Sequence, residues 1–600
     1  MKPTTEILAR ISQNSLANKE EVFTKLYRYL LRPDIYFVAY KNLYANNGAA
    51  TKGVNEDTED GFSETKIDSI IKALADETYQ PMPVRRTYIQ KKNNRKKLRP
   101  LGIPTFTDKL VQEVLRMILE AVYEPIFLDV SHGFRPKRSC HTALKQLRRE
   151  FNGTRWFVEG DIKGCFDNIN HAVLVGLLNN KIKDARITKL IYKFLKAGYL
   201  ENWQYHKTYS GTPQGGIISP LLANIYLHEL DKFVMKLKSE FDTPGVGQIT
   251  PEYRELHNEI KRLSHRLTKV TGEEREMVLA EYKPKRQKLM TIPCTAQTDK
   301  KLKYVRYADD FLIAVKGNRE DCQWIKSRLA EFIGDTLKME LSEDKTLITH
   351  SSKCARFLGY DVRVRRSGKI KRGGPGHVKM RTLNGGVELL VPLNDKIRQF
   401  VFTKGVAIQK KDGSMFPVHR KYLVGLTDLE IVSVYNAELR GICNYYGMAS
   451  NFCKLHYLAY LMEYSCLKTL ASKHKTSLSK TIDKFNDGTG KWGIPYETKQ
   501  GNKRRYFANY ADCKGKGSAM DYIINAAVVY GYAVNTLENR LKAKVCELCG
   551  TTESDHYEVH HINKLKNLKG KERWEIAMIA KHRKTLVVCR DCHRSIIHKK

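Results

Sequence analysis

Apolar positions along this chain fall into short runs typical of β-strands and longer stretches with helical spacing. Two short runs, Tyr304–Arg306 and Phe311–Val315, flank the tetrapeptide Tyr307-Ala308-Asp309-Asp310. This arrangement predicts a β-hairpin that carries two adjacent carboxylates at its turn. A third short run, Phe157–Ile162, has an acid at Asp161 near its end. We therefore expect three acids at the ends of β-strands.

Helical spacing marks three longer stretches. The first follows a glycine-rich bend at Gly211–Pro220, where Ser219 is predicted to cap the helix and Pro220 to lie in its first turn. The second, at about 250–290, has apolar residues at alternating intervals of four and three, which predicts a helical hairpin insertion with a turn at Thr271-Gly272. The third runs from about 390 to 480. The apolar face of the first stretch comprises Leu222, Ile225, Leu230, Phe233 and Leu237. That of the second comprises Leu256, Ile260, Leu263, Leu267 and Val270. That of the third comprises Leu429, Val432, Leu439 and Ile442.

The chain is long enough for several domains, since 600 residues exceed what one hydrophobic core usually organises. Strand runs and helical stretches occur in separate blocks, so we expect a multidomain α+β protein. The divisions 1–389, 390–485, 486–545 and 546–600 are implied by the family resemblance of the motifs described below.

The three predicted acids suggest a metal site. Adjacent carboxylates repel each other unless a cation lies between them, and paired divalent ions stabilise both the attacking and the leaving oxygens of a phosphoryl transfer. The palm of a nucleic-acid polymerase typically has this arrangement, in which an acid such as Asp161 at a strand end faces an acidic pair such as Asp309 and Asp310 on a hairpin. Aspartate also favours turns for local hydrogen-bonding reasons, so the tetrapeptide alone does not decide the matter.

Charge points to a polyanionic partner. Lysine and arginine number 104 against 65 aspartates and glutamates, a net charge of +39. Nucleic acid fits such an excess. An anionic membrane is the competing partner, but no apolar run is long enough to span one. The N-terminus lacks the apolar core of a signal peptide, and the thirteen cysteines are an odd number. These features favour a reducing cytoplasm.

Three clusters concentrate the basic residues. One cluster alone would be read as a solvated face, but three of them, two with interleaved aromatic residues, favour contacts to phosphates and stacking on bases. The predicted nucleic-acid-binding residues are Arg85, Arg86, Lys91 and Lys92; Arg365, Arg366, Lys371 and Arg372; and Arg504 and Arg505.

Together these motifs resemble a known family. The series Asp161 with Phe166, Pro213-Gln214-Gly215-Gly216 and Tyr307–Asp310 stands in the order found in reverse transcriptases. Three further motifs narrow the resemblance to group II intron reverse transcriptases: Arg99–Pro104, His132–Pro136 and Ser139–Ala143. A later motif, Arg440–Tyr446, resembles the thumb signature (domain X) of intron maturases, and the stretch to about 545 is similar to that family's DNA-binding segment.

The resemblance implies roles for individual residues. Asp161, Asp309 and Asp310 would hold two Mg²⁺ ions, which suit carboxylates and triphosphate oxygens. Arg99 would clamp the triphosphate of the incoming nucleotide, and Phe166 would exclude a ribose 2′-OH. Gln214 and Gly215 would contact the nucleotide near its sugar.

The C-terminal region predicts a second site. Cys546 and Cys549 form one Cys-x-x-Cys pair, and Cys589 and Cys592 form another. Two such pairs are typical of a tetrahedral Zn²⁺ site, so a purely structural zinc ribbon is one interpretation.

The histidines between and after these pairs favour another interpretation, because they resemble those of HNH nucleases. That resemblance implies His561 as the general base, with His560 and either His593 or His598 as ligands of a divalent metal, Mg²⁺ in our expectation. The family commonly has an asparagine before its second Cys pair. Here Lys584-Thr585-Leu586 occupies that place, so the role is unfilled or falls to Asn567.

The two sites suggest one reaction sequence. A nuclease that leaves a 3′-OH on DNA supplies the primer a polymerase needs, as in target-primed reverse transcription. The expected partners are group II intron RNA, double-stranded target DNA and deoxynucleoside triphosphates, with no membrane; a homodimer is left open. The expected setting is the bacterial cytoplasm, as a nucleoid-associated ribonucleoprotein. The alternatives are a maturase that acts only in splicing and a defence-associated reverse transcriptase.

Overall fold

The computed structural model describes residues 3–44, 46, 48–91, 94–213, 215–244, 248–294, 299–367, 369–373, 378–380, 382, 384–498, 501–514, 536–562 and 564–598. Two predicted site residues, Lys92 and Gln214, lie outside this set. The side chains of Lys91, Lys371, Arg372 and His598 also lie outside it, although their backbone is described.

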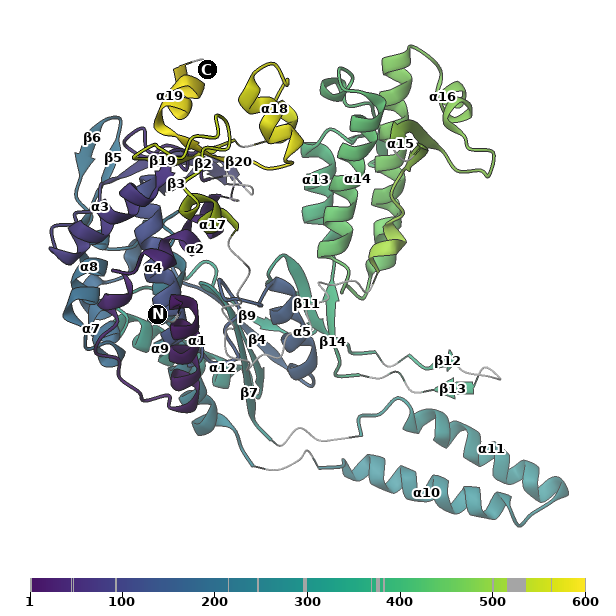
Figure 1. Cartoon of the computed structure of the whole chain (residues 1–600). Coiled ribbons are helices and arrows are strands. Elements are labelled where there is room, and N and C mark those ends of the chain that lie inside the picture. Colours follow the sequence, from purple (N-terminus) through teal and green to yellow (C-terminus); the bar gives the residue numbers. More distant parts are fainter. Residues whose placement is uncertain are drawn as a thin grey trace.

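The N-terminal part combines helices with a small sheet (Figure 1). Helix α4 is almost entirely buried, polar residues such as Asp108 and Glu113 included, and packs against α1, α2 and the later helix α9. Strands β2 and β3 form an antiparallel hairpin, which β5 and β6 extend to a sheet of order β3-β2-β5-β6. The bounds are α1 (Thr4–Ala17), α2 (Pro33–Tyr44), α3 (Glu64–Ala75), α4 (Phe106–Tyr123), β2 (Val84–Lys91), β3 (Asn94–Ile103), β5 (Tyr199–Glu201) and β6 (Gln204–His206).

An antiparallel sheet of order β7-β8-β4-β9 lies at the centre. The alternation along β8 separates its two faces: Phe311 and Ile313 join the apolar core shared with α9 and α12, while Leu312 and Ala314 join the core shared with α5. Burial on both faces makes this sheet the rigid base for residues at its edge. The bounds are β4 (Trp156–Asp161), β7 (Lys301–Tyr307), β8 (Asp310–Lys316), β9 (Ile348–His350), α5 (Cys140–Glu150), α6 (Cys165–Asn168), α7 (His171–Lys181), α8 (Ala185–Lys196), α9 (Ser219–Phe241) and α12 (Arg319–Asp335).

Helix α9 begins where the sequence predicts it, but its predicted cap is wrong. Ser219 is the first helical residue, and the preceding Ile218 provides no side-chain cap. The Ser219 hydroxyl instead donates to the Pro213 carbonyl oxygen at 3.0 Å, so it closes the glycine-rich loop rather than the helix end. Pro220 lies in the first turn, as expected.

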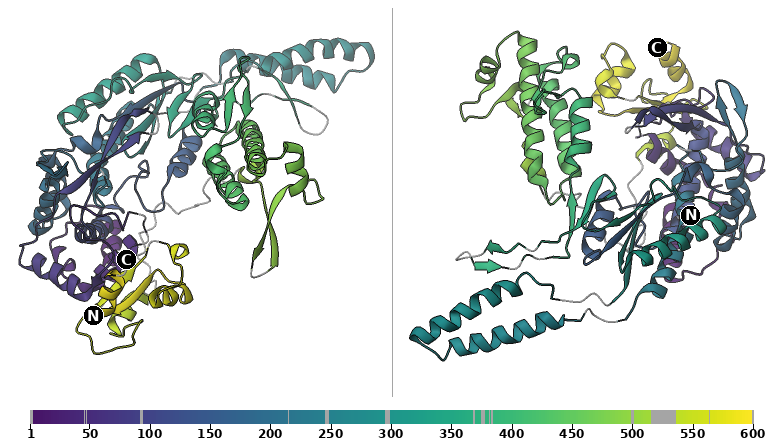
Figure 2. Two further views of the ribbon diagram at one scale, coloured as in Figure 1. Left: turned by 90° about the horizontal axis from the view of Figure 1, so that it is seen from above. Right: turned by 180° about the vertical axis from the view of Figure 1, so that it is seen from behind.

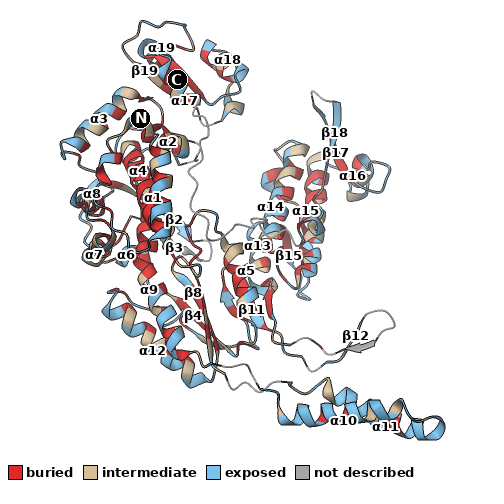
Figure 3. Ribbon diagram, turned by 60° about the horizontal axis from the view of Figure 1, so that its bottom comes forward, coloured by how far each residue is buried: buried red, intermediate tan, exposed pale blue. Residues whose placement is uncertain are grey.

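The predicted helical insertion forms a hairpin of α10 (Pro251–Leu267) and α11 (Gly272–Leu289) that projects away from the rest of the molecule (Figures 1 and 2). Its outer surfaces are exposed (Figure 3), and its few buried side chains, Leu256, Ile260 and Val278, lie between the two helices' apolar sides. The connection spans residues 268–271, so it includes Thr271 of the predicted turn, whereas Gly272 already begins α11.

A helical module follows the central sheet. In α14 the buried face includes Ile431, Val432, Tyr435 and Leu439. Thr427 caps the N-terminus of this helix and forms a capping box with Glu430. Four small sheets belong to this stretch of the chain: β10-β11-β14, β12-β13, β15-β16 and β17-β18. The β12-β13 hairpin projects away from the helices (Figure 1). The bounds are β10 (Ala355–Phe357), β11 (Tyr360–Val364), β12 (Lys371–Gly373), β13 (Val378–Met380), β14 (Val387–Leu390), α13 (Arg398–Thr403), β15 (Ala407–Gln409), β16 (Met415–Pro417), α14 (Asp428–Tyr445), α15 (Leu455–His474), α16 (Leu478–Phe485), β17 (Gly493–Thr498) and β18 (Gly501–Tyr506).

The C-terminal module returns to the N-terminal part of the chain. Its strand β19 pairs on one side with β20 and on the other with β1, which comes from the N-terminal region. Figures 1 and 2 show this module beside α2 and α3. The bounds are β1 (Phe62–Ser63), α17 (Thr536–Lys542), β19 (Tyr557–His561), α18 (Arg573–Ala580), β20 (Thr585–Cys589) and α19 (Arg590–His598).

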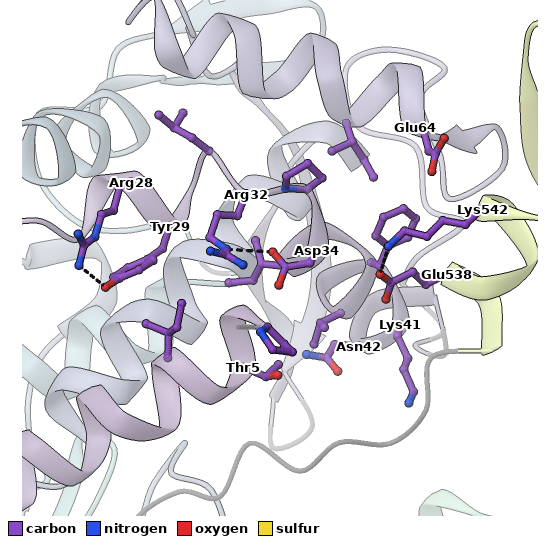
Figure 4. A pocket seen from close by; sticks show the side chains of 18 of the residues that line it. Thr5, Arg28, Tyr29, Arg32, Asp34, Lys41, Asn42, Glu64, Glu538 and Lys542 are labelled. Atoms are coloured by element: carbon purple, nitrogen blue, oxygen red, sulfur yellow. Dashed lines mark hydrogen bonds and ion pairs between the residues drawn. The ribbon is translucent and has the colours of Figure 1, made fainter. Parts of the chain in front are cut away.

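A groove of about 1440 Å³ lies where α17 approaches the N-terminal helices (Figure 4). Arg32, Asp34 and Lys41 line it from the N-terminal side, and Glu538 and Lys542 line it from α17. Basic and acidic side chains alternate around its wall, so it has no single sign of charge.

Candidate active sites

The three predicted acids meet at one edge of the central sheet. Tyr307 pairs with Asp310, so only Ala308 and Asp309 form the turn between β7 and β8. On the other side of β8, Asp310 is the cross-strand partner of Asp161 at the end of β4. Lys345 Nζ contacts Asp161 Oδ2 at 2.6 Å and supplies a positive charge beside the cluster. The structure thus brings together residues that lie almost 150 positions apart in the sequence.

The electrostatics of this edge favour a bound cation. Desolvation by the surrounding protein, together with the negative charges of Asp309 and Asp161, raises the pKa of Asp310 to about 7. Desolvation and the charge of Asp161 also raise the pKa of Asp309. Carboxylates whose negative charges are this costly suit divalent cations, because a metal ion offsets the repulsion. The donor set therefore fits the metal ions predicted for it.

A buried network fixes the turn that carries Asp309. Ala308 has φ of +56°, in the left-handed region, and its carbonyl oxygen accepts a hydrogen bond from Arg306 Nη1 at 2.9 Å. Arg306 is fully buried and forms an ion pair with Asp231 of α9 at 2.6 Å. Gly133 packs directly on the turn: a Cβ atom at Gly133 would lie 2.3 Å from the Ala308 nitrogen. Only glycine permits this approach.

Of the predicted nucleotide-binding residues, Arg99, Phe166 and Gly215 lie in the described part of the chain. Arg99 is exposed on β3, and its charge acts against the rise in the pKa of Asp309 that desolvation causes. Phe166, in α6, meets the exposed ring of Phe134 edge-on, with centroids 6.0 Å apart. Gly215 lies against β3, because a Cβ atom there would be 2.6 Å from the Gly102 carbonyl oxygen. The glycine-rich loop therefore abuts the strand that carries Arg99.

The described arginines of the basic clusters are partly held by other protein groups. The Arg86 guanidinium lies 3.6 Å from the centre of the Tyr199 ring, and Arg365 pairs with Glu388 at 2.6 Å. Arg366 is exposed and donates to Ser351 Oγ at 3.2 Å. Arg85 is half-buried on β2, and Arg504 and Arg505 are exposed on β18, on a hairpin that extends from the helical module (Figure 3).

The four cysteines of the C-terminal module form one cluster. A sulfur atom from each of Cys546, Cys549, Cys589 and Cys592 lies within 4.8 Å of the others, a spacing that fits one metal ion. Cys546 and Cys589 are buried, and the Cys549 backbone N–H points at the Cys546 sulfur at 3.4 Å. Backbone N–H groups around Cys546 outweigh its desolvation and lower its pKa to about 7. This donor set suits Zn²⁺.

Three of the four predicted histidines, His560, His561 and His593, have described side chains. His560 and His593 are buried with ring centroids 5.4 Å apart, and His561 follows on the same strand. His561 Nδ1 contacts Glu59 Oε1 at 3.0 Å, whereas its buried Nε2 has no hydrogen-bond partner among the described residues. Asn567 lies exposed in the loop after β19.

Several residues at these sites were not predicted from the sequence. Lys345, Arg306 and the acidic pair Glu59-Asp60 contact the sites from elements distant in the chain. A lone lysine or acid carries no local signal of such a role. The one available hint was Arg306 in the short predicted run Tyr304–Arg306, since a charge in a buried strand needs a partner.

Comparisons with known proteins identify three families along the chain. Residues 89–243 match the reverse transcriptase (RNA-dependent DNA polymerase) family, residues 387–523 the type II intron maturase family, and residues 546–593 the AI2M/AI1M-like HNH endonuclease family. Group II intron-encoded protein LtrA of Lactococcus lactis subsp. cremoris is 72% identical over 600 residues, which is 100% of each chain. The putative COX1/OXI3 intron 2 protein of Saccharomyces cerevisiae is 31% identical over 98% of this chain and 67% of its own.

Among solved structures, telomerase from Candida albicans matches with a TM-score of 0.33 and 13% identity, over 74% of this chain and 59% of that one. None of the helices in the described part of the chain is both long and apolar enough to cross a membrane. The comparisons give no support for the homodimer left open above. This chain belongs to the group II intron-encoded proteins and combines a reverse transcriptase, an intron maturase and an HNH endonuclease in one polypeptide.

Proposed function

We propose that this protein nicks double-stranded DNA with its C-terminal module and extends the new 3′-OH by copying intron RNA with its central module. The convergence of Asp161, Asp309 and Asp310 at one sheet edge carries the proposal. In this assignment residues 1–389 form fingers and palm, with the insertion α10–α11, and 390–485 form the thumb. Residues 486–545 bind DNA, and 546–600 cut it.

In the polymerase, the three aspartates would hold two Mg²⁺ ions. When bound, such ions activate the primer hydroxyl and stabilise the charge that develops on the phosphates. Arg99 contributes a fixed positive charge for the triphosphate, and the Phe166 ring limits the space beside the sugar. Lys345 Nζ balances the charge of the Asp161 carboxylate. A metal ion bound by Asp161 would take the place of this lysine.

In the nuclease, His561 acts as the general base. Its Nδ1 faces Glu59, which favours the tautomer with a proton on Nδ1 and a lone pair on Nε2. The Nε2 atom can then take the proton of an attacking water. His560 and His593 would hold a divalent ion that stabilises the leaving 3′-oxygen. The cysteine quartet would hold a structural Zn²⁺, the ion that a set of four thiolates suits.

Maturase function requires a large RNA-binding surface. The net charge of +39 and the exposed basic hairpin β17–β18 support binding of intron RNA and of target DNA. Each phosphate contact contributes through counterion release, so affinity should fall steeply with salt. A protein that acts only in splicing is the second candidate, but the intact acid cluster favours synthesis as well.

The test uses two single substitutions in the full chain. Asp309→Ala should abolish cDNA synthesis on a primed RNA template and leave intron RNA binding and DNA nicking unchanged. His561→Ala should abolish nicking and leave extension of a pre-nicked primer unchanged. Full polymerase activity in Asp309→Ala would overturn the proposed polymerase site. Loss of both activities in either variant would indicate misfolding rather than a separate site.

A further inference from the structure

Two acids from the N-terminal module enter the nuclease site. Glu59 and Asp60 immediately precede strand β1, which adds to the edge of the nuclease sheet by pairing Phe62 with Val559. The Gly61 N–H donates to the Val559 carbonyl oxygen at 3.0 Å, so the chain is fixed next to the acids. The sheet that carries the nuclease histidines is therefore built from both ends of the chain.

The supporting contacts hold this segment firmly. Phe62 is fully buried and stacks on Tyr40 of α2, with ring centroids 4.0 Å apart. The Tyr40 hydroxyl donates to the Glu59 carbonyl oxygen at 2.9 Å. Across the interface, Thr65 Oγ1 and His556 Nδ1 are 2.7 Å apart. On the adjoining side, Lys542 and Glu538 of α17 face α2 and α3 across the groove in Figure 4.

Asp60 lies among the nuclease histidines. Its Oδ1 atom is 3.2 Å from His560 Nδ1 and 3.1 Å from His593 Nε2. The same oxygen accepts the backbone N–H of His561 at 3.0 Å. Within the part of the chain that the structure describes, Asp60, His560 and His593 form one of two groups whose ligand atoms are close enough together to hold a metal ion.

The donor spacing fits a metal ion. Adjacent ligands of an octahedral ion, each at about 2.1 Å, are about 3.0 Å apart, close to the two distances from Asp60 to the histidine nitrogens. His593 Nδ1 also contacts Glu558, so in the metal-bound state Nδ1 would keep its proton and Nε2, beside Asp60, would be the ligand atom. A carboxylate behind a histidine is the usual support of a metal-binding imidazole. An acid placed beside two such nitrogens can replace the asparagine absent before the second cysteine pair.

We propose that Asp60 is the third protein ligand of the nuclease metal, so that the endonuclease site is complete only when the C-terminal module docks on the N-terminal module. This inference rests on the proposed nuclease function of His560, His561 and His593. Glu59 is a positioning residue in the same arrangement, because it orients the imidazole of His561. The consequence is a structural link between the two enzymes: cleavage requires the reverse transcriptase module to be in place.

Metal binding, rather than cleavage, tests the proposal. All proteins carry Asp309→Asn and Asp310→Asn to remove metal binding at the polymerase site, and Zn²⁺ is supplied in advance. Bound Mn²⁺ is titrated by electron paramagnetic resonance. Asp60→Ala should weaken the nuclease-site affinity at least about 10-fold, as should His593→Ala. Asp60→Asn retains an oxygen ligand without the charge, so its Mn²⁺ affinity should fall between those of the parent and of Asp60→Ala. Asp68→Ala, an exposed acid of α3, removes the same charge and should bind as the parent does.

The possible results separate the two proposals. Unchanged affinity in Asp60→Ala together with loss in His593→Ala would overturn the role of Asp60 and leave the nuclease assignment standing. Unchanged affinity in both would overturn the nuclease ligand assignment itself. Hydrogen exchange of the β19 amides provides the second measurement. The His561 amide is left out of this comparison, because Asp60 itself accepts its N–H. If Asp60→Ala loses affinity and also loses protection at the other β19 amides, Asp60 acts through docking and is not a ligand.

Discussion

Gly133→Ala provides a sharp test of how the polymerase turn is held. The new Cβ atom would lie 2.3 Å from the Ala308 nitrogen, about 1.1 Å short of ordinary contact at 3.4 Å. The obstacle is backbone on both sides, so no side chain can rotate away. Gly133 is itself held, because its carbonyl oxygen accepts a hydrogen bond from the buried Asn224 at 2.7 Å. The turn that carries Asp309 must therefore shift by about 1 Å.

A displacement of this size at reacting groups costs on the order of 100-fold in rate. The assay is single-nucleotide incorporation on a primed RNA template under pre-steady-state conditions. Gly176→Ala is the matched control, since a Cβ atom there meets nothing within 4 Å and the residue lies within α7. We expect the control to match the parent. DNA nicking should be unchanged in both variants, which excludes global unfolding.

Incorporation by Gly133→Ala within about threefold of the parent rate would refute this reasoning. It would mean that the turn adapts without disturbing Asp309, or that the contact with Gly133 does not fix it. A loss of nicking that parallels the loss of incorporation would also count against it, because the effect would then be general instability.

Two further predictions follow from the same edge of the sheet. Arg306→Met leaves the carboxylate of Asp231 buried without its cation, so it should destabilise the central module by about 3–5 kcal/mol, measured by hydrogen exchange in β7 and β8; a loss below about 1 kcal/mol would contradict it. Folding raises the pKa of Asp310 from 3.8 to about 7. The native protein therefore holds the proton of the Asp310 carboxyl more tightly than the unfolded chain does. Without metal, the free energy of unfolding should fall as pH rises from about 4 to 7. Mg²⁺ needs the ionised carboxylate and should therefore raise the melting temperature more at pH 8 than at pH 6. Asp310→Asn is the control variant, because it lacks the titrating carboxyl. Equal increases in melting temperature at both pH values would contradict the prediction.

Local patterns were sufficient for much of the architecture. The hairpin around Asp309, the strand ending at Asp161 and the helical insertion occur where the apolar spacing predicts them. These elements were predictable because burial of one face imposes a period of 2 or 3.6 on the sequence. The cap predicted at Ser219 failed because a hydroxyl can satisfy a loop carbonyl as readily as a helix end.

By itself, the sequence determined which residues could do chemistry: ordered acids, paired cysteines and adjacent histidines, each marked by spacing within a few residues. Only the tertiary structure decided which of them share a site with distant partners. Asp60 and His593 are separated by more than 500 positions, yet their side chains lie 3.1 Å apart. The physical reason is that sequence periodicity reports on local burial, whereas docking of one module on another depends on complementary surfaces that leave no repeating pattern in the chain.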